Sequence, residues 1–514
     1  MSTDWNSGYV SDIDYTYGFY RELSPTVLAL AALVQGRRAP KIDTPLTYCE
    51  LGCGQGLSMN ILAAANPHIE FYATDFNPAQ IAGARRLADE AELSNMHFYD
   101  DSFEEFNERD DLPETFDIIS LHGIYSWISA DNRAHILNFI KKRLKTGGLV
   151  YISYNTLPGW AAIMPLRQLL VSQSSGKVGP IAAKISEALE FSKKLSEVGA
   201  DYFGANSAVG QRLEKMMPMS RNYLAHEYFN RDWTPFYFQQ VADDMAGAKL
   251  TFIASSNLMD HIDLINLTQD QIAFIAAEPD PLRRQGLRDY VVNQQFRRDI
   301  FVKGAENITV KESQTAWLDC RFALASRPQD VSEKFKGRLG EMTLQTAVYP
   351  PILKGFEKGP MTLRELLQDE TIGAISWSNI LQAIALLVGL GHLQPCLPAK
   401  NEKKRRDSTR ALNKVLINRA QYSGDIGYLS SPVTGSAVPV GRFEQMFLRS
   451  LAAGRKDPSA WAADTWETIK NQGQKVRHEG KIIESDDDNL KELTRQATEF
   501  QEKKLAILTT LQVV

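Results

Sequence analysis

The sequence has few of the features that mark secreted, membrane-spanning or nucleic-acid-binding proteins. Only four of its 514 residues are cysteine. That is too few for a disulfide framework, so we expect a protein of a reducing compartment and predict a cytoplasmic location. No run of about 18 apolar residues occurs, and we therefore expect no membrane span. The formal net charge of −5 gives the chain no overall basic character, which argues against nucleic acid as a partner.

Two of the cysteines, Cys49 and Cys53, have a C-x3-C spacing of the kind that zinc sites can show. Cys49 falls in a predicted strand and Cys53 in a glycine-rich turn. No second pair of cysteine or histidine residues lies nearby in the sequence to complete a set of four ligands. We therefore predict no metal site.

The segment 46–56, LTYCELGCGQG, is the most informative part of the chain. An apolar run ends at Glu50, glycines follow at positions 52, 54 and 56, and residues 58–65 resemble the first turns of a helix. Glycines in such a turn adopt positive φ and let the backbone approach a ligand closely. A carboxylate at Glu50 would repel a phosphate and instead favours a cationic ligand. S-adenosylmethionine, with its sulfonium and ammonium groups, is such a ligand.

A second acid supports this interpretation. Asp75 ends the next predicted strand and follows Glu50 by 25 residues. In dinucleotide-binding folds, an acid about 20 residues beyond the glycine turn binds the ribose hydroxyls. The two patterns together resemble motifs I and II of class I methyltransferases.

Strand and helix patterns alternate in the first third of the chain, which predicts a parallel, doubly wound sheet. Two later segments, 249–254 and 298–303, are expected to be strands six and seven of the same sheet. Residues 163–225 would then be a helical insertion that forms a lid or a dimer surface. The first five predicted strands are 46–51, 69–74, 96–99, 116–121 and 149–154.

The predicted fold class is α/β, with a Rossmann-like sheet, a helical insertion and a mainly α, winged-helix-like C-terminal region. Six segments are expected along the chain. They are an aromatic and helical lid (1–40), a methyltransferase core (41–162), the helical insertion (163–225), the remainder of the core with a regulatory segment (226–305), a winged-helix-like middle domain (306–400) and a C-terminal domain (401–514).

The N-terminal segment is rich in aromatic residues. We expect them either to cover the cofactor or to pack on the core of the α/β domain. They are Trp5, Tyr9, Tyr15, Tyr17, Phe19 and Tyr20.

The predicted sheet brings the cofactor-binding residues together at the carboxyl ends of its strands, where open α/β sheets bind ligands. Asp75 would take the ribose hydroxyls, and Phe76 would pack on the adenine. Either Asp101 or Ser102 would meet the adenine amino group, with Asp100 as a competing candidate. The complete predicted set is Glu50, Gly52, Gly54, Gly56, Asp75, Phe76, Asp101, Ser102, Phe103 and His122.

Methyl transfer requires mainly position and electrostatics from the protein, because the cofactor already carries an activated carbon. His122 follows the fourth strand and could act as a base, hold the substrate or support the cofactor. Tyr125 and Trp127 could line a channel for an amine or pack in the core. Tyr154 and Asn155 lie at the end of the fifth strand and could orient a lysine amine that desolvation helps to deprotonate.

Taken together, the motifs resemble those of bacterial class I methyltransferases with a methyltransferase regulatory domain, a family that includes the rickettsial protein lysine methyltransferases. The resemblance implies S-adenosylmethionine as cofactor, a protein lysine as substrate, an open substrate cleft and a homodimer. The matching segments are 50–56, 122–127, 154–160, 226–233 and 288–302.

Three functions remain open from the sequence. The leading one is an S-adenosylmethionine-dependent methyltransferase that acts on lysine side chains of a protein. The alternatives are a methyltransferase for a small molecule and a cofactor-binding regulatory protein without turnover. An open acidic groove would favour a protein substrate, and a closed apolar pocket would favour a small one.

Overall fold

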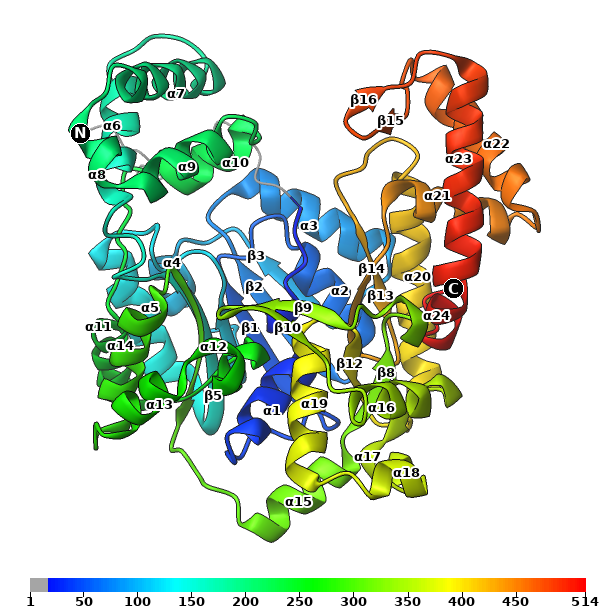
Figure 1. The fold of residues 1–514 in the computed structure, drawn as a ribbon, viewed down its shortest axis with the longest axis horizontal. Coiled ribbons are helices and arrows are strands. Elements are labelled where there is room, and N and C mark those ends of the chain that lie inside the picture. Colours follow the sequence, from blue (N-terminus) through cyan, green and yellow to red (C-terminus); the bar gives the residue numbers. More distant parts are fainter. Residues whose placement is uncertain (1–16) are drawn as a thin grey trace.

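The computed structural model describes residues 17–514 (Figure 1), so the predictions for Trp5, Tyr9 and Tyr15 lie outside the described residues. Its centre is a seven-stranded sheet with the strand order β3-β2-β1-β4-β5-β7-β6. The strands are β1 (Leu46–Leu51), β2 (Ile69–Thr74), β3 (Met96–Tyr99), β4 (Phe116–Leu121), β5 (Leu144–Asn155), β6 (Leu250–Ser255) and β7 (Phe296–Lys303).

The first five strands are parallel, and β7 runs antiparallel to both β5 and β6. The α/β class and the Rossmann-like sheet are therefore confirmed, as is the prediction that two late segments join the same sheet. Strand β1 lies between β2 and β4 in the sheet. The order of the strands along the chain therefore reverses direction at β1, with β2 and β3 on one side of it and β4 and β5 on the other. A crevice forms at such a point, beyond the carboxyl ends of the strands.

Helices cover both faces of the sheet (Figure 1). Neighbouring strand residues point to opposite faces, so Tyr48 packs with α1 and α2 in one hydrophobic cluster while Cys49 packs with α4 and α5 in another. The helices around the sheet are α1 (Pro25–Val34), α2 (Leu57–Ala65), α3 (Pro78–Glu90), α4 (Phe103–Glu108), α5 (Ala130–Arg143), α11 (Phe238–Gly247), α12 (Asp263–Asn266), α13 (Gln269–Ala276) and α14 (Pro281–Val292).

Two helix starts place residues at the crevice. Asn77 caps α3, because its side chain accepts hydrogen bonds from the backbone N–H groups of Ala79 and Gln80 at 3.0 and 3.4 Å. Ser102 caps α4 through a capping box with Glu105. Each cap fixes the short segment that joins its helix to the preceding strand.

Five helices between β5 and β6 form a separate hydrophobic cluster around Ile185, Leu189 and Leu213. In Figure 1 these helices lie at one end of the molecule, beyond the sheet. They are α6 (Met164–Ser174), α7 (Ile181–Glu197), α8 (Asp201–Ala205), α9 (Ser207–Met216) and α10 (Arg221–Tyr228).

After β7 the chain forms three short strands that pair antiparallel in the order β11-β8-β12. The winged-helix character of this region stays a prediction. The elements up to residue 396 are α15 (Val310–Asp319), β8 (Arg321–Leu324), β9 (Lys334–Gly337), β10 (Gly340–Thr343), α16 (Tyr349–Gly355), β11 (Met361–Thr362), α17 (Leu363–Leu366), α18 (Glu370–Gly373), α19 (Trp377–Gly389) and β12 (Leu393–Cys396).

The last part of the chain packs against α2, whose nine residues are all buried. The Ser430 hydroxyl donates to the Ile61 carbonyl at 3.1 Å, and the Asn66 side chain donates to the Gly435 carbonyl at 2.9 Å. The hairpin of β13 (Tyr428–Ser431) and β14 (Ser436–Pro439) therefore supports the helix that begins at the glycine turn. The other elements of this last part are α20 (Glu402–Arg419), α21 (Arg442–Ala452), α22 (Pro458–Asn471), β15 (Arg477–His478), β16 (Lys481–Ile482), α23 (Asp486–Phe500) and α24 (Ala506–Thr510).

No helix within residues 17–514 is both long enough and apolar enough to cross a membrane.

Removing a buried side chain at the contact with α2 should destabilise the whole fold. Leu429 in β13 is fully buried, so Leu429→Ala should lower the free energy of unfolding by about 2–5 kcal/mol. Leu339→Ala serves as a control at a half-exposed position and should change it by less than about 0.5 kcal/mol. Urea denaturation of both variants measures the difference, and an equal effect of the two changes would contradict the packing of β13 on α2.

Candidate functional site

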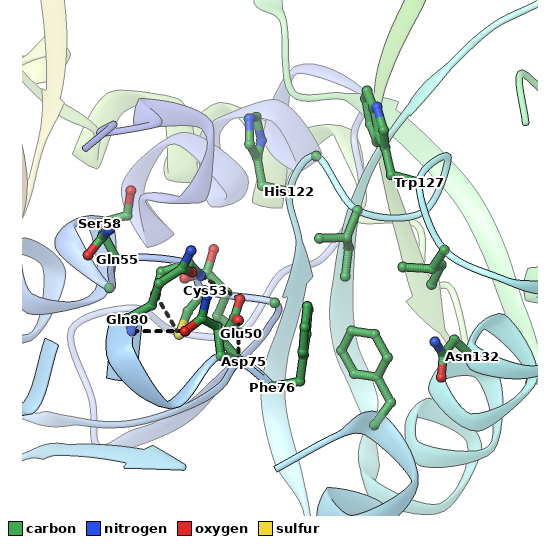
Figure 2. Close-up of a pocket in the computed structure, with 18 of the residues that line it drawn as sticks. Glu50, Cys53, Gln55, Ser58, Asp75, Phe76, Gln80, His122, Trp127 and Asn132 are labelled. Carbon is green, nitrogen blue, oxygen red and sulfur yellow. Dashed lines mark hydrogen bonds between the residues drawn. The ribbon is translucent and has the colours of Figure 1, made fainter. Parts of the chain in front are cut away.

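A cavity opens at the carboxyl ends of β1, β2 and β4 (Figure 2). Its empty space is about 1270 Å³, including the part that is open to solvent, which is ample for a ligand of nucleoside size. We call it the cofactor cavity. Every residue predicted to bind the cofactor lines it, and so does Trp127. In Figure 2, Glu50 and Asp75 lie side by side, with His122 and Trp127 along one edge of the cavity.

Residues 52–56, the glycine turn, form the floor of the cavity. Gly52, Gly54 and Gly56 have φ values of +78°, +53° and +65°, a conformation that other residues rarely adopt. A Cβ atom on Gly52 would lie 2.7 Å from the side chain of Ile124, and one on Gly56 would lie 2.6 Å from Ala84. The glycines are therefore required both by the backbone conformation and by the close packing around it.

Hydrogen bonds fix the glycine turn to the end of β2. The backbone N–H groups of Gly52 and Cys53 donate to the Thr74 carbonyl at 2.8 and 3.1 Å. The Asp75 carboxylate accepts from the N–H groups of Gly54 and Asn77 at 2.9 and 3.0 Å, one at each oxygen. A carboxylate has about four acceptor positions, so Asp75 can still accept two hydroxyl donors from a ligand.

Glu50 lies beneath the turn and is almost completely buried. Its Oε2 atom has no hydrogen-bond partner among the described residues. Burial is the main cause that raises the pKa of Glu50 to about 8, and the nearby Asp75 raises it further. A buried acid with an unsatisfied oxygen beside a second acid is typical of a site that binds a positively charged group.

The far side of the cavity is formed by the segment after β3. Asp101 lines the cavity and accepts a hydrogen bond from Arg109 at 3.0 Å. Asp100 does not line it and instead pairs with Arg85, so of these two candidates only Asp101 is a lining residue. Ser102 and Phe103 follow it along the same wall.

His122 is held between two tyrosines. Its ring stacks on Tyr20 with a centroid separation of 3.7 Å, and its Nδ1 atom shares a 2.8 Å hydrogen bond with the Tyr151 hydroxyl. Burial, with a smaller effect of Arg298, lowers the pKa of His122 to about 3. The imidazole is therefore neutral at physiological pH and too weak a base to hold a proton there. Tyr20 itself lines the cavity, whereas Phe19 and Tyr17 pack with the hydrophobic core.

Two residues predicted to take part in catalysis lie elsewhere. Tyr125 is fully buried and donates to Asp244 at 2.7 Å, and Tyr154 is fully buried and donates to Asp299 at 2.7 Å. Neither residue lines the cofactor cavity or a second cavity that adjoins it. Both side chains belong to the hydrophobic cluster that includes residues of α11. Tyr154 reaches this cluster because its side chain points to the opposite face of β5 from Asn155.

A second cavity adjoins the first and shares His122, Gly123 and Trp127 with it. Asn155 lies in this second cavity rather than in the first, together with Glu227 from α10. Sequence reasoning assigned no role to Glu227, nor to Asn132 and Asp232 of the cofactor cavity. The segment 226–233, which carries part of the family resemblance, contains Glu227 and Asp232 and was the signal available for them.

Comparison with known proteins agrees with this geometry. Residues 42–191 match the model of a methyltransferase domain, and residues 220–303 match that of a predicted methyltransferase regulatory domain. The chain belongs to the class I S-adenosylmethionine-dependent methyltransferases with a methyltransferase regulatory domain. Its cofactor is therefore S-adenosylmethionine, as predicted.

Two relatives and one solved structure illustrate how far the likeness extends. The uncharacterized protein sll1526 of Synechocystis sp. is 43% identical over 507 residues, which are 99% of each chain. The uncharacterized protein RP789 of Rickettsia prowazekii is 27% identical over 290 residues, 56% of this chain and 51% of that protein. The structure of PKMT2 from Rickettsia typhi in complex with AdoHcy has a TM-score of 0.68 at 17% identity, covering 95% of this chain and 98% of its own. The fold of this methyltransferase is thus shared with PKMT2 along nearly the whole chain.

The raised pKa of Glu50 predicts a pH-dependent stability in the ligand-free methyltransferase. The folded state keeps the proton of Glu50 up to about pH 8, whereas an unfolded chain loses it near pH 4.3. Stability is therefore lost as pH rises toward 8, by up to about 1.4 kcal/mol per pH unit. Between pH 6 and 8 the free energy of unfolding of the wild type should fall more steeply than that of Glu50→Gln, and parallel pH dependences would contradict the assignment.

Proposed function

We propose that this methyltransferase transfers methyl groups from S-adenosylmethionine to lysine side chains of a protein. The observation that carries the proposal is a second cavity, with a carboxylate and aromatic walls, directly beside the cofactor cavity. The motif resemblance to the rickettsial protein lysine methyltransferases and the fold shared with PKMT2 support the same acceptor.

The residues of the cofactor cavity fit the groups that S-adenosylmethionine presents. Glu50, with its unpaired buried oxygen, would balance the positive charge of the amino acid part, either directly or through the turn. Asp75 would accept the two ribose hydroxyls with its remaining acceptor positions. Phe76 and Phe103 would pack on the adenine ring, whose amino group Asp101 or Ser102 would meet.

The cofactor supplies a methyl carbon that is already activated by a sulfonium. The protein therefore has to position the acceptor and exclude water. His122, neutral and fixed between Tyr20 and Tyr151, would serve as a rigid wall between the two cavities rather than as the base.

A methyltransferase for a small molecule and a regulatory protein without turnover remain the alternative functions. A closed apolar pocket would favour a small-molecule acceptor. The second cavity instead contains several polar side chains, which favours the end of a protein side chain. They are Asn155, Arg212, His226, Glu227 and Gln295.

Binding of the cofactor near neutral pH should release a proton. Glu50 is protonated in the free protein, since its pKa is about 8, and a nearby positive charge lowers that pKa and favours the carboxylate. Calorimetric titration with S-adenosylmethionine at pH 7, in two buffers of different ionisation enthalpy, should show net release of up to about one proton. Glu50→Gln should abolish the release, and buffer-independent enthalpies for the wild type would contradict the role of Glu50.

The ribose assignment can be tested with a matched pair of acids. Asp75→Asn should weaken S-adenosylmethionine binding by about ten-fold or more, because it removes a charged acceptor for two hydroxyls. Asp100→Asn changes an acid outside the cavity and should leave the affinity within about two-fold. Equal affinities of the two variants would refute the assignment of Asp75.

Transfer of a labelled methyl group shows whether the acceptor is a protein or a small molecule. We expect that S-adenosylmethionine with a labelled methyl, incubated with the protein and a bacterial lysate, labels a discrete protein band. Hydrolysis of that band should yield methylated lysine. Label confined to the small-molecule fraction would select the alternative enzyme, and binding without transfer to either fraction would favour the regulatory function.

We also propose that the protein is a homodimer that associates through the helical insertion. This segment carries large apolar side chains that are exposed, among them Phe191 (42%) and Val198 (78%) of the α7 region. Light scattering during size-exclusion chromatography should give the mass of a dimer, and Phe191→Glu should shift it to that of a monomer. A monomeric wild type would rule the dimer out. The cytoplasmic location stays a prediction.

A further inference from the structure

The second cavity lies at the end of the cofactor cavity where the methyl group is expected. Strand β4 pairs with β1, and Glu50 lies opposite Ser120 in that pair. The residues shared by the two cavities, His122, Gly123 and Trp127, follow β4. They would therefore lie close to the amino acid and sulfonium part of a bound cofactor, with its adenine toward β3. An acceptor in the second cavity would face the methyl group across this shared wall.

The walls of the second cavity come from distant parts of the chain. Tyr223 and Glu227 belong to α10, Trp160 follows β5, and Phe296 begins β7. The Trp127 indole N–H donates to the backbone carbonyl of Glu227 at 3.3 Å. This bond links α10 directly to the loop after β4, so α10 is part of the wall of the second cavity.

Glu227 is the acid of this cavity. No described residue donates a hydrogen bond to its carboxylate, and no described cation lies within 4.0 Å of it. Arg212 is the basic residue on the same wall, but its guanidinium donates to the Tyr228 hydroxyl and lies over the ring of Trp160 at 5.8 Å. Burial raises the pKa of Glu227 to about 7, and the charge of Arg212 opposes that rise only in part. The carboxylate is thus available to a ligand.

An unpaired carboxylate among aromatic side chains is the arrangement that recognises an alkylammonium group. Aromatic faces attract cations, and a charge-assisted hydrogen bond to a carboxylate fixes the ammonium in place. The aromatic residues here are Trp127, Trp160, Tyr223 and Phe296. A carboxylate or phosphate acceptor would meet repulsion from Glu227 instead.

We propose that the second cavity is the acceptor site and receives a primary alkylamine, with Glu227 pairing with the ammonium and accepting its proton. This assignment rests on the proposed function and names the residues that select the substrate. Proton transfer converts the ammonium and the carboxylate to an amine and a carboxylic acid. The nitrogen lone pair then forms the bond to the methyl carbon while the electrons of the carbon–sulfur bond remain on sulfur. The products are a methylammonium group and S-adenosylhomocysteine.

A two-part ligand tests the acceptor site by binding alone. The probe is an S-adenosylhomocysteine analogue with nitrogen in place of sulfur, which carries an aminoalkyl arm where the methyl group would be. The control ligand carries a plain alkyl arm of the same length. Calorimetry with the full chain should show that the aminoalkyl ligand binds about ten-fold or more tightly than the alkyl one, the gain expected for one charged hydrogen bond.

The same titration with two variants tests whether Glu227 itself, rather than acidic charge in general, causes the tighter binding of the aminoalkyl ligand. Glu227→Gln keeps the size of the side chain and should remove the gain from the amine arm, while S-adenosylhomocysteine itself still binds. Glu214→Gln changes an exposed acid of the neighbouring α9 and should retain the gain. A gain that survives in Glu227→Gln would overturn the role of Glu227.

The outcomes also distinguish a failure of the acceptor-site proposal from a failure of the proposed function on which it rests. If S-adenosylhomocysteine binds the wild type and the two armed ligands bind equally, the second cavity is not an amine site, but the methyltransferase stands. If S-adenosylhomocysteine does not bind at all, the proposed function fails with it.

Discussion

The hydrogen bonds between the glycine turn and the end of β2 determine the geometry of everything around them. The N–H groups of Gly52 and Cys53 point to the Thr74 carbonyl, and that of Gly54 points to the Asp75 carboxylate. These bonds draw the ends of two adjacent strands together and leave Glu50 beneath the turn. The two acids are therefore neighbours because the backbone requires it, and burial together with the nearby Asp75 keeps Glu50 protonated in the empty site.

Several parts of the fold support this costly arrangement. Helix α2 begins at the turn and is buried along its whole length, and the β13–β14 hairpin is hydrogen-bonded to its middle through Ser430 and to its end through Gly435. The N-terminal segment contributes Tyr20, which stacks on His122. A cationic ligand would favour the ionised form of Glu50 and would stabilise the folded site on binding.

The local features of the site could be predicted from the sequence because each depends on a short pattern. The two acids at the carboxyl ends of neighbouring strands and the glycines after Glu50 each follow from residues within a single strand–turn–helix unit. The choice between Asp100 and Asp101 could not be made, since a shift of one residue along a strand reverses the direction of every side chain. For the same reason the sequence could not show that Tyr154 and Asn155 point to opposite faces of β5.

The second cavity could not be predicted because its walls meet only in three dimensions. Trp127, Trp160, Glu227 and Phe296 are separated by long stretches of sequence, and no local pattern indicates that α10 folds back over the end of β4. The stack of Tyr20 on His122, with its effect on the pKa of the imidazole, likewise depends on a long-range contact. The sequence presented His122 as a possible base, whereas in the structure its pKa is lowered to about 3 and it lines both cavities.

The most direct test of this account is a crystal structure of the protein with S-adenosylhomocysteine. The account predicts that the ribose hydroxyls contact Asp75, that the amino acid part lies over the glycine turn beside Glu50, and that the sulfur faces the wall of His122 and Gly123 toward the second cavity. A cofactor product bound in the reverse direction, with its adenine at the glycine turn and its sulfur away from the second cavity, would contradict it.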